Sequence, residues 1–138
     1  MKTPVTVDAS VFVNAFSPDE RGSDESAEFL FQSRKDSVPL IQPTLFFPEV
    51  VASIARKQDD GDVALELMHE LKKFSKLTLV DLDEDLADYA SEIAAKHRLR
   101  GSDAVYAAVA LRFGAELITL DKEQLARLPK VLSVRKPQ

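Results

Sequence analysis

Short apolar runs rich in β-branched residues alternate along the chain with longer stretches in which apolar residues recur every three or four positions. The first pattern is typical of buried strands and the second of amphipathic helices. Strands are predicted over residues 4–8, 38–42, 77–81, 116–120 and 131–134. Helices are predicted over residues 9–16, 23–34, 43–58, 60–74, 83–96, 102–113 and 122–128.

Two of these helices are expected to pack differently. In residues 60–74 the apolar side chains form a single stripe, as in a helix with one solvent-exposed face. Residues 102–113 are apolar on nearly every face, which predicts a central, buried helix. We interpret Gly101 as a break before this helix and Gly114 as its C-cap residue.

The alternation of strands and helices predicts the α/β class. We expect a three-layer α/β/α fold with a central parallel sheet of about four to five strands. A chain of 138 residues fits one domain, so residues 1–138 are predicted to form a single unit. Ligands of such sheets bind beyond the carboxyl ends of the strands, and candidate functional residues are therefore sought there.

The formal net charge of −5 argues against a surface that binds polyanions non-specifically. It leaves room for a nucleic-acid enzyme whose positive charge is carried by bound metal ions. The absence of cysteine excludes disulfides, a thiol nucleophile and thiolate zinc sites. No apolar run is long enough for a membrane span or a signal peptide, so we expect a cytoplasmic protein that does not cross a membrane.

Acidic residues occur where the predicted strands and helices meet. Asp8 and Asp121 follow the strands over residues 4–8 and 116–120, Asp103 begins the buried helix, and Glu49 lies early in the helix after the second strand. If they converge, they form a pocket of hard oxygen ligands suited to Mg²⁺ or Mn²⁺. Two carboxylates roughly 5 Å apart repel by about 3 kcal/mol at an effective dielectric constant near 20, so the cluster requires protons or cations.

Each acid also has a simpler interpretation. Asp121 with Gln124 resembles a capping box, and Asp103 could likewise only cap its helix. Glu49 falls on the polar side of its helix and could be a solvated surface acid. Asp8 is harder to explain in this way, because an acid beside a buried strand needs a partner.

Four segments in order resemble the PIN domain family, including the VapC-like toxins of toxin–antitoxin pairs: VDASVFVNAF, PEVVASIAR, GSDAVYAAVA and LITLDKE. The resemblance runs from Val7 to the last predicted strand, and its most specific part is SDAVYAAVALRFGAELITLD. Pro48, directly before Glu49, departs from the pattern and suggests that the helix starts there.

The resemblance implies a Mg²⁺- or Mn²⁺-dependent endoribonuclease that hydrolyses RNA phosphodiester bonds. The residues that match the family's catalytic and metal-binding acids are Asp8, Glu49, Asp103 and Asp121. Ser10 and Thr119 match hydroxyl residues that could orient a carboxylate or a metal-bound water, or could simply belong to a turn or strand. The resemblance further implies an RNA substrate, a cognate antitoxin protein and a homodimer.

Other interpretations stay open at this point. A catalytically inactive PIN fold that only binds another protein is the main alternative, although the intact acidic quartet argues against it. A phosphoacceptor signalling domain is disfavoured, because such domains need a pair of acids near the first strand. Phe12, Phe16, Phe46 and Phe47 could form a docking or dimer surface, or the core. Candidate phosphate contacts, if not merely solvated charges, are Arg56, Lys57, Arg98, Arg100 and Lys122.

Overall fold

The computed structural model describes residues 2–138, which form a five-stranded parallel sheet flanked by helices. The strands are β1 (Val5–Val7), β2 (Leu40–Pro43), β3 (Leu77–Val80), β4 (Glu116–Ile118) and β5 (Val134–Arg135). The helices are α1 (Ala9–Ala15), α2 (Ser23–Lys35), α3 (Phe46–Gln58), α4 (Gly61–Leu71), α5 (Glu84–His97), α6 (Gly101–Phe113) and α7 (Lys122–Arg127).

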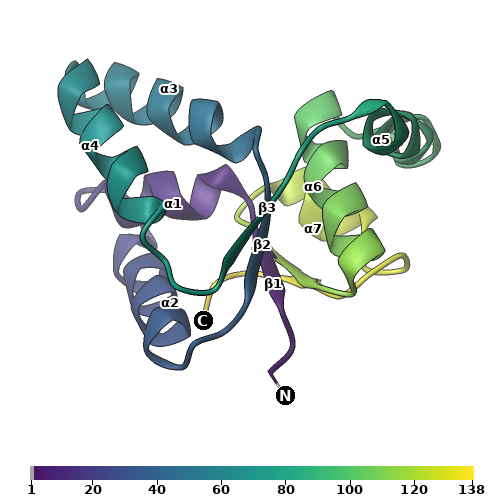
Figure 1. The fold of residues 1–138 in the computed structure, drawn as a ribbon, viewed down its shortest axis with the longest axis horizontal. Helices are drawn as coiled ribbons and strands as arrows, with labels where there is room; N and C mark the ends of the chain where they lie inside the picture. Colours follow the sequence, from purple (N-terminus) through teal and green to yellow (C-terminus); the bar gives the residue numbers. More distant parts are fainter. Residues whose placement is uncertain (1) are drawn as a thin grey trace.

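The sheet has the order β3-β2-β1-β4-β5, with every neighbouring pair parallel. The chain starts at the central strand, builds outward through β2 to β3, and then crosses to the other side of β1 to form β4 and β5. Figure 1 shows α1 to α4 on one face of the sheet and α5 to α7 on the other. The predicted three-layer α/β/α fold is therefore confirmed.

The direction of chain progression reverses between β1 and β4. Helices leaving these two strands go to opposite faces of the sheet, which opens a crevice at their carboxyl ends. Asp8 follows β1 directly, and Asp121 lies three residues beyond the end of β4. The topology thus places these two predicted site residues at the crevice.

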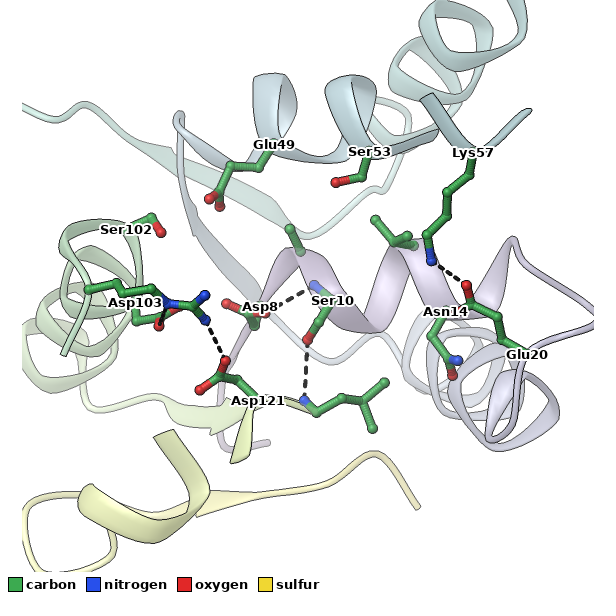
Figure 2. Close-up of a pocket in the computed structure, with 14 residues that line it drawn as sticks. Asp8, Ser10, Asn14, Glu20, Glu49, Ser53, Lys57, Ser102, Asp103 and Asp121 are labelled. Carbon is green, nitrogen blue, oxygen red and sulfur yellow. Dashed lines mark hydrogen bonds and ion pairs between the residues drawn. The ribbon is translucent and has the colours of Figure 1, made fainter. Parts of the chain in front are cut away.

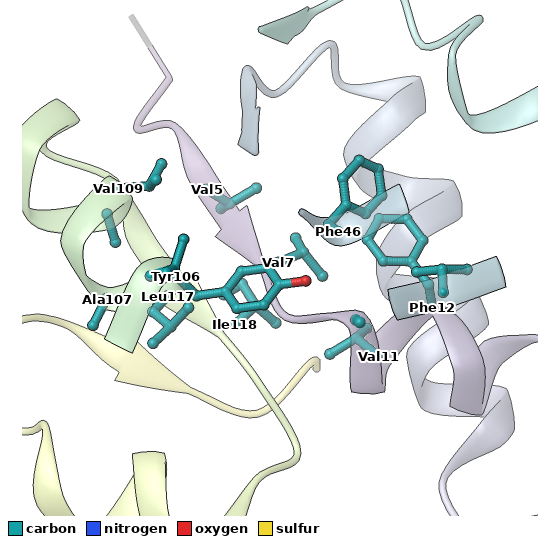
Figure 3. Close-up of a cluster of buried hydrophobic side chains, with 14 of the residues drawn as sticks. Val5, Val7, Val11, Phe12, Phe46, Tyr106, Ala107, Val109, Leu117 and Ile118 are labelled. Atoms are coloured by element: carbon teal, nitrogen blue, oxygen red, sulfur yellow. The ribbon is translucent and has the colours of Figure 1, made fainter. Parts of the chain in front are cut away.

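Helix α6 is the central helix of its layer, as its all-round apolar pattern predicts. Residues 103–110 are all buried, and the small side chains of its four alanines permit close approach to the sheet. Tyr106 lies fully buried in the core beneath β1 and β4 (Figure 3). Within residues 2–138, every helix is too short or too polar to cross a lipid bilayer.

Two predicted helix starts are wrong. Gly101 is the first residue of α6 rather than a break before it, because the extended residue that precedes the helix is Arg100. Helix α3 begins at Phe46 instead of Pro43 or Pro48. Pro48 is accommodated in its first turn, where backbone N–H groups have no partner within the helix and a proline costs little.

Three of the four phenylalanines considered for a docking surface belong to the core. Phe12 and Phe46 are fully buried with ring centroids 5.4 Å apart (Figure 3). Phe47 is also buried, and its ring centroid lies 4.3 Å from that of Phe46. Only Phe16 is exposed, at 41%. The docking or dimer interpretation of this set is therefore wrong for Phe12, Phe46 and Phe47.

The side chain of Gln42 holds β1 and β2 together at their carboxyl ends. Its amide nitrogen donates to the carbonyl of Val7 at 2.7 Å, and its carbonyl oxygen accepts from the Val7 N–H at 2.6 Å. Both strands are buried here, and the amide reproduces the bonds that a neighbouring backbone would make. Gln42 thereby fixes the residue directly before Asp8.

We predict that Gln42→Leu lowers the free energy of unfolding by about 2–4 kcal/mol, because two buried backbone groups of Val7 lose their partners. Urea denaturation followed by circular dichroism measures this change. The control is Gln58→Leu at an exposed position of α3, which should change stability by no more than about 0.5 kcal/mol. Equal effects of the two substitutions would show that Gln42 does not hold the strand ends.

Candidate active site

A cavity of about 490 Å³ opens at the carboxyl edge of the sheet, over the ends of β1 and β4. All four predicted acids line it: Asp8, Glu49, Asp103 and Asp121. In Figure 2 their carboxylates point into one shared space from four different elements. The sequence-based grouping of these residues is thus reproduced in space.

Each acid lies at the start of a helix. Asp8 and Asp121 are the N-cap residues of α1 and α7, and Glu49 and Asp103 lie in the first turns of α3 and α6. Four helix N-termini therefore point toward the same cavity. Their positive dipole ends favour carboxylates there, which offsets part of the repulsion within the cluster.

Asp8 is buried, with 7% of its surface exposed. Burial raises its pKa above the ordinary value, and the nearby charges of Glu49 and Asp121 raise it further. The backbone N–H of Ser10 donates to its carboxylate at 3.0 Å and acts in the opposite direction. Asp8 thus takes up a proton more readily than a solvated aspartate.

Glu49 is tied to the core rather than free in solvent. The buried hydroxyl of Tyr106, on the opposite layer, donates to its carboxylate at 2.7 Å. Burial raises the pKa of this phenol, as do the charges of Glu49 and Asp8, so Tyr106 remains a hydrogen-bond donor. The bond turns Glu49 toward the cavity and argues against the surface-acid interpretation.

Arg100 bridges the remaining two acids. Its Nε lies 3.0 Å from the carboxylate of Asp103, and its Nη2 lies 2.6 Å from that of Asp121. Burial raises the pKa of Asp103, although the bond from Arg100 lowers it. The arginine side chain itself is 68% exposed, so water screens both ion pairs and the guanidinium can leave at modest cost.

The hydroxyls of Ser10 and Thr119 both bond to the chain around the end of β4, and the Ser10 hydroxyl also hydrogen-bonds to Asp8, which lowers the pKa of that carboxyl. The hydroxyl of Ser10 accepts from the N–H of Leu120 at 3.2 Å and so links the start of α1 to the chain after β4. Thr119 accepts from the N–H of Asp121 at 3.0 Å and donates to the buried side chain of Gln124 at 2.5 Å. Both residues set the separation of Asp8 and Asp121 through the backbone.

Gln124 supports two acids at once, and the sequence pattern indicated only its place in a capping box. Its backbone N–H donates to Asp121 at 2.9 Å, which confirms Asp121 as an N-cap residue, but the full capping box does not form because the Asp121 N–H donates to Thr119. Its buried amide also reaches the carbonyl of Asp103 at 3.4 Å. Asp121 therefore caps a helix and lines the cavity at the same time.

The far end of the cavity carries an ion pair that the sequence did not indicate. Lys57, near the end of α3, pairs with Glu20 in the loop after α1. Figure 2 shows this pair away from the four acids, beyond Ser53. Of the predicted phosphate contacts, Lys57 and Arg100 line the cavity.

The donor set suits Mg²⁺ or Mn²⁺, because carboxylate oxygens are hard ligands. The residues that could hold such ions are Asp8, Glu49, Asp103 and Asp121. In the arrangement seen for residues 2–138, no three acidic or imidazole side chains are close enough together to hold one ion. The donor set therefore fits a divalent cation provided that Arg100 moves off the two aspartates.

Known proteins resemble the chain over nearly its full length. The ribonuclease VapC3 of Pyrobaculum aerophilum is 28% identical over 133 residues, which cover 94% of this chain and 98% of that protein. The crystal structure of VapC20 from Mycobacterium tuberculosis has a TM-score of 0.71 at 16% identity, covering 88% of this chain and 93% of that one. VapBC from Salmonella typhimurium, bound to DNA, has a TM-score of 0.72 at 14% identity and covers 99% of each chain.

The solved structures are too distant in sequence to show more than a shared fold, and they match the α/β/α architecture described above. The family comparison is more specific. The PIN domain family model matches residues 5–131, from the first strand to the segment before β5. This match confirms the resemblance noted in the four sequence segments, and the chain belongs to the PIN domain family.

Proposed function

We propose that this protein is a divalent-metal-dependent endoribonuclease that hydrolyses RNA phosphodiester bonds. The observation that carries the proposal is the convergence of four carboxylates from four elements on one cavity, with Asp8 and Asp103 buried. Such a concentration of negative charge destabilises the fold unless cations complete it. The ribonuclease name of the relative from Pyrobaculum aerophilum supports RNA as the substrate.

Asp8, Glu49, Asp103 and Asp121 would hold the ions, which supply an activated water and stabilise the leaving oxygen of an in-line displacement. Tyr106 keeps Glu49 directed into the cavity, and the Ser10 N–H orients Asp8. Arg100 would leave the two aspartates and lie at the cavity rim, where its guanidinium can donate to a phosphate.

We further propose that the protein is the toxin of a toxin–antitoxin pair and acts on RNA in the cytoplasm. VapC20 is described as a toxin that cleaves the sarcin–ricin loop, and similar structures include VapBC complexes. The expected partner is a small antitoxin, encoded beside this gene, whose C-terminal segment covers the acidic cavity. A homodimer is expected on the same family grounds.

Asp103→Asn is expected to lower the rate of RNA cleavage at least about 100-fold, equivalent to ~2.7 kcal/mol of lost transition-state stabilisation. The change removes a charge that the metal needs and keeps the shape of the side chain. Cleavage of a labelled RNA is measured with Mg²⁺, with Mn²⁺ and with EDTA. Asp85→Asn, at an exposed position of α5, serves as the control and should retain activity.

Three outcomes contradict the proposal. Full cleavage by Asp103→Asn would remove this residue from the active site. Equal cleavage in EDTA and in Mg²⁺ would show that the reaction does not use a divalent metal. A wild-type protein that binds Mn²⁺ but cleaves no RNA under any condition would favour the inactive binding module.

Asp8→Asn is expected to stabilise the protein in EDTA at pH 7 by about 1 kcal/mol, or roughly 3 °C in Tm. The pKa of Asp8 is raised in the folded state, so its ionisation at neutral pH opposes folding. Below about pH 4 the carboxyl is protonated in both states, and the advantage of the asparagine should disappear. Thermal denaturation between about pH 3 and pH 8 measures the difference, and a variant less stable than wild type at pH 7 would refute the electrostatic account.

Arg100→Gln is expected to tighten Mn²⁺ binding about fivefold, because the metal no longer competes with the guanidinium for Asp103 and Asp121. Isothermal titration calorimetry gives the Kd. Lys122→Gln is the matched control, since it removes an equal charge from a side chain that makes no ion pair within residues 2–138. If both variants bind Mn²⁺ equally, general electrostatics rather than displacement governs the affinity.

A further inference from the structure

A second cavity, of about 440 Å³, is lined by seven residues, of which four are lysines or arginines. It lies where the end of α5 meets the end of α7, and we call it the basic pocket. Its ionisable lining residues are Lys96, His97, Arg98, Arg127 and Lys130. The lysines and arginines of this set are all exposed, so the charge faces solvent.

The basic pocket stands out against the charge of the whole chain. Residues 96–100 and 122–130 contain six lysines and arginines against the single acid Glu123, a net charge of +5. Since the chain as a whole carries −5, all its other residues together carry −10. These two short segments are therefore positively charged in an otherwise acidic chain, and they join the candidate active site at Arg100 and Asp121.

Capping of helix ends explains only part of this concentration. Cations are favoured at the carboxyl ends of α5 and α7, and Arg127 does donate to the backbone carbonyl of Arg98. Arg127 also pairs with Glu123 at 3.5 Å. Across residues 2–138, the side chains of Lys96, Arg98 and Lys130 have neither an acidic partner nor a backbone acceptor, and they remain free to bind an anion.

The pocket is close enough to the acidic cavity to contact the same ligand. Helix α7 has Asp121 at its start and Arg127 in its last turn, a span of about 9 Å for six residues at 1.5 Å each. A further cavity, lined by Ser10, Arg100, Leu120, Asp121, Lys122 and Glu123, shares Arg100 and Asp121 with the acidic cavity. Arg100, at the acidic cavity, thus follows Arg98 of the basic pocket by only two residues.

We propose that the basic pocket binds the phosphate backbone of the RNA strand flanking the cleaved bond. This inference rests on the ribonuclease function proposed above. It assigns the electrostatic attraction of the RNA to the basic pocket, which lies outside the carboxylate cavity. A protein that is otherwise strongly acidic repels a polyanion, and phosphate contacts supply most of the affinity in non-specific nucleic-acid binding. The lining contains no phenylalanine, tyrosine or tryptophan, so contacts are to phosphates rather than to stacked bases.

The test compares two double variants with the same change in charge. Lys96→Gln/Lys130→Gln alters the basic pocket, whereas Lys35→Gln/Lys76→Gln alters exposed lysines before β2 and β3, at the opposite edge of the sheet. Both are made in the Asp103→Asn protein, so that the RNA is not cleaved during the measurement. Binding of a fluorescein-labelled 12-nucleotide oligouridine is followed by anisotropy in Mg²⁺ at several salt concentrations.

The pocket variant should weaken RNA binding on the order of tenfold at about 0.1 M salt, with the slope of log Kd against log salt smaller by about 1.4 for two lost phosphate contacts. The control variant should stay within about twofold of the parent protein. Circular dichroism of each protein checks that the fold is retained.

The proposal is overturned if both double variants lose affinity equally, if the salt slope is unchanged, or if the parent protein binds no oligouridine. A labelled polyglutamate that binds the parent as tightly as the RNA, and is lost in the pocket variant, would instead identify a docking site for an acidic protein. Cleavage by the wild-type protein is measured separately. Active wild type with an unaffected pocket variant therefore refutes this inference alone and leaves the ribonuclease function intact.

Discussion

The candidate active site depends on one electrostatic constraint, the repulsion among four carboxylates that share one cavity. Part of that repulsion is offset within the chain by four helix N-termini, by the Ser10 N–H and by Arg100. Arg100 supplies one positive charge against four potential negative ones, and burial raises the pKa of both Asp8 and Asp103. The fold thus maintains a strained concentration of charge, which is a property of sites that act through bound cations.

The topology of the sheet creates this concentration, and buried polar side chains keep it in place. The reversal of chain direction between β1 and β4 brings Asp8 and Asp121 to one crevice. Gln42 fixes the end of β1, and the Thr119–Gln124 pair fixes the chain after β4. These amides and hydroxyls bond to backbone, so small shifts of either strand end are resisted where the distances between carboxylates matter most.

The sequence predicted the order of the elements and the place of the aspartates at one cavity, because both have local signatures. The spacing of apolar residues and the turn residues between them locate strands and helices. Asp8 is recognised because it directly follows a buried strand. Glu49 required the family resemblance, since its partner Tyr106 is 57 residues away and looks like an ordinary core residue. Arg100 was predicted only as a phosphate contact or a solvated charge for the same reason: no local pattern indicates that its guanidinium bridges two aspartates from different elements.

The same limitation affected the interpretation of charge. A net charge of −5 suggested a surface unsuited to binding a polyanion. The net charge is correct, but it does not show how the charged residues are distributed over the surface. Lysines and arginines at 96–100 and 122–130 are far apart in the chain, yet the ends of α5 and α7 place them beside one cavity. An acidic pocket that needs cations and a basic pocket that attracts phosphates are complementary parts of one substrate path. Because the lysines and arginines of the basic pocket lie apart from the four acids, Arg100 is the one cation of these segments that pairs with them, and it must move for metal ions to bind.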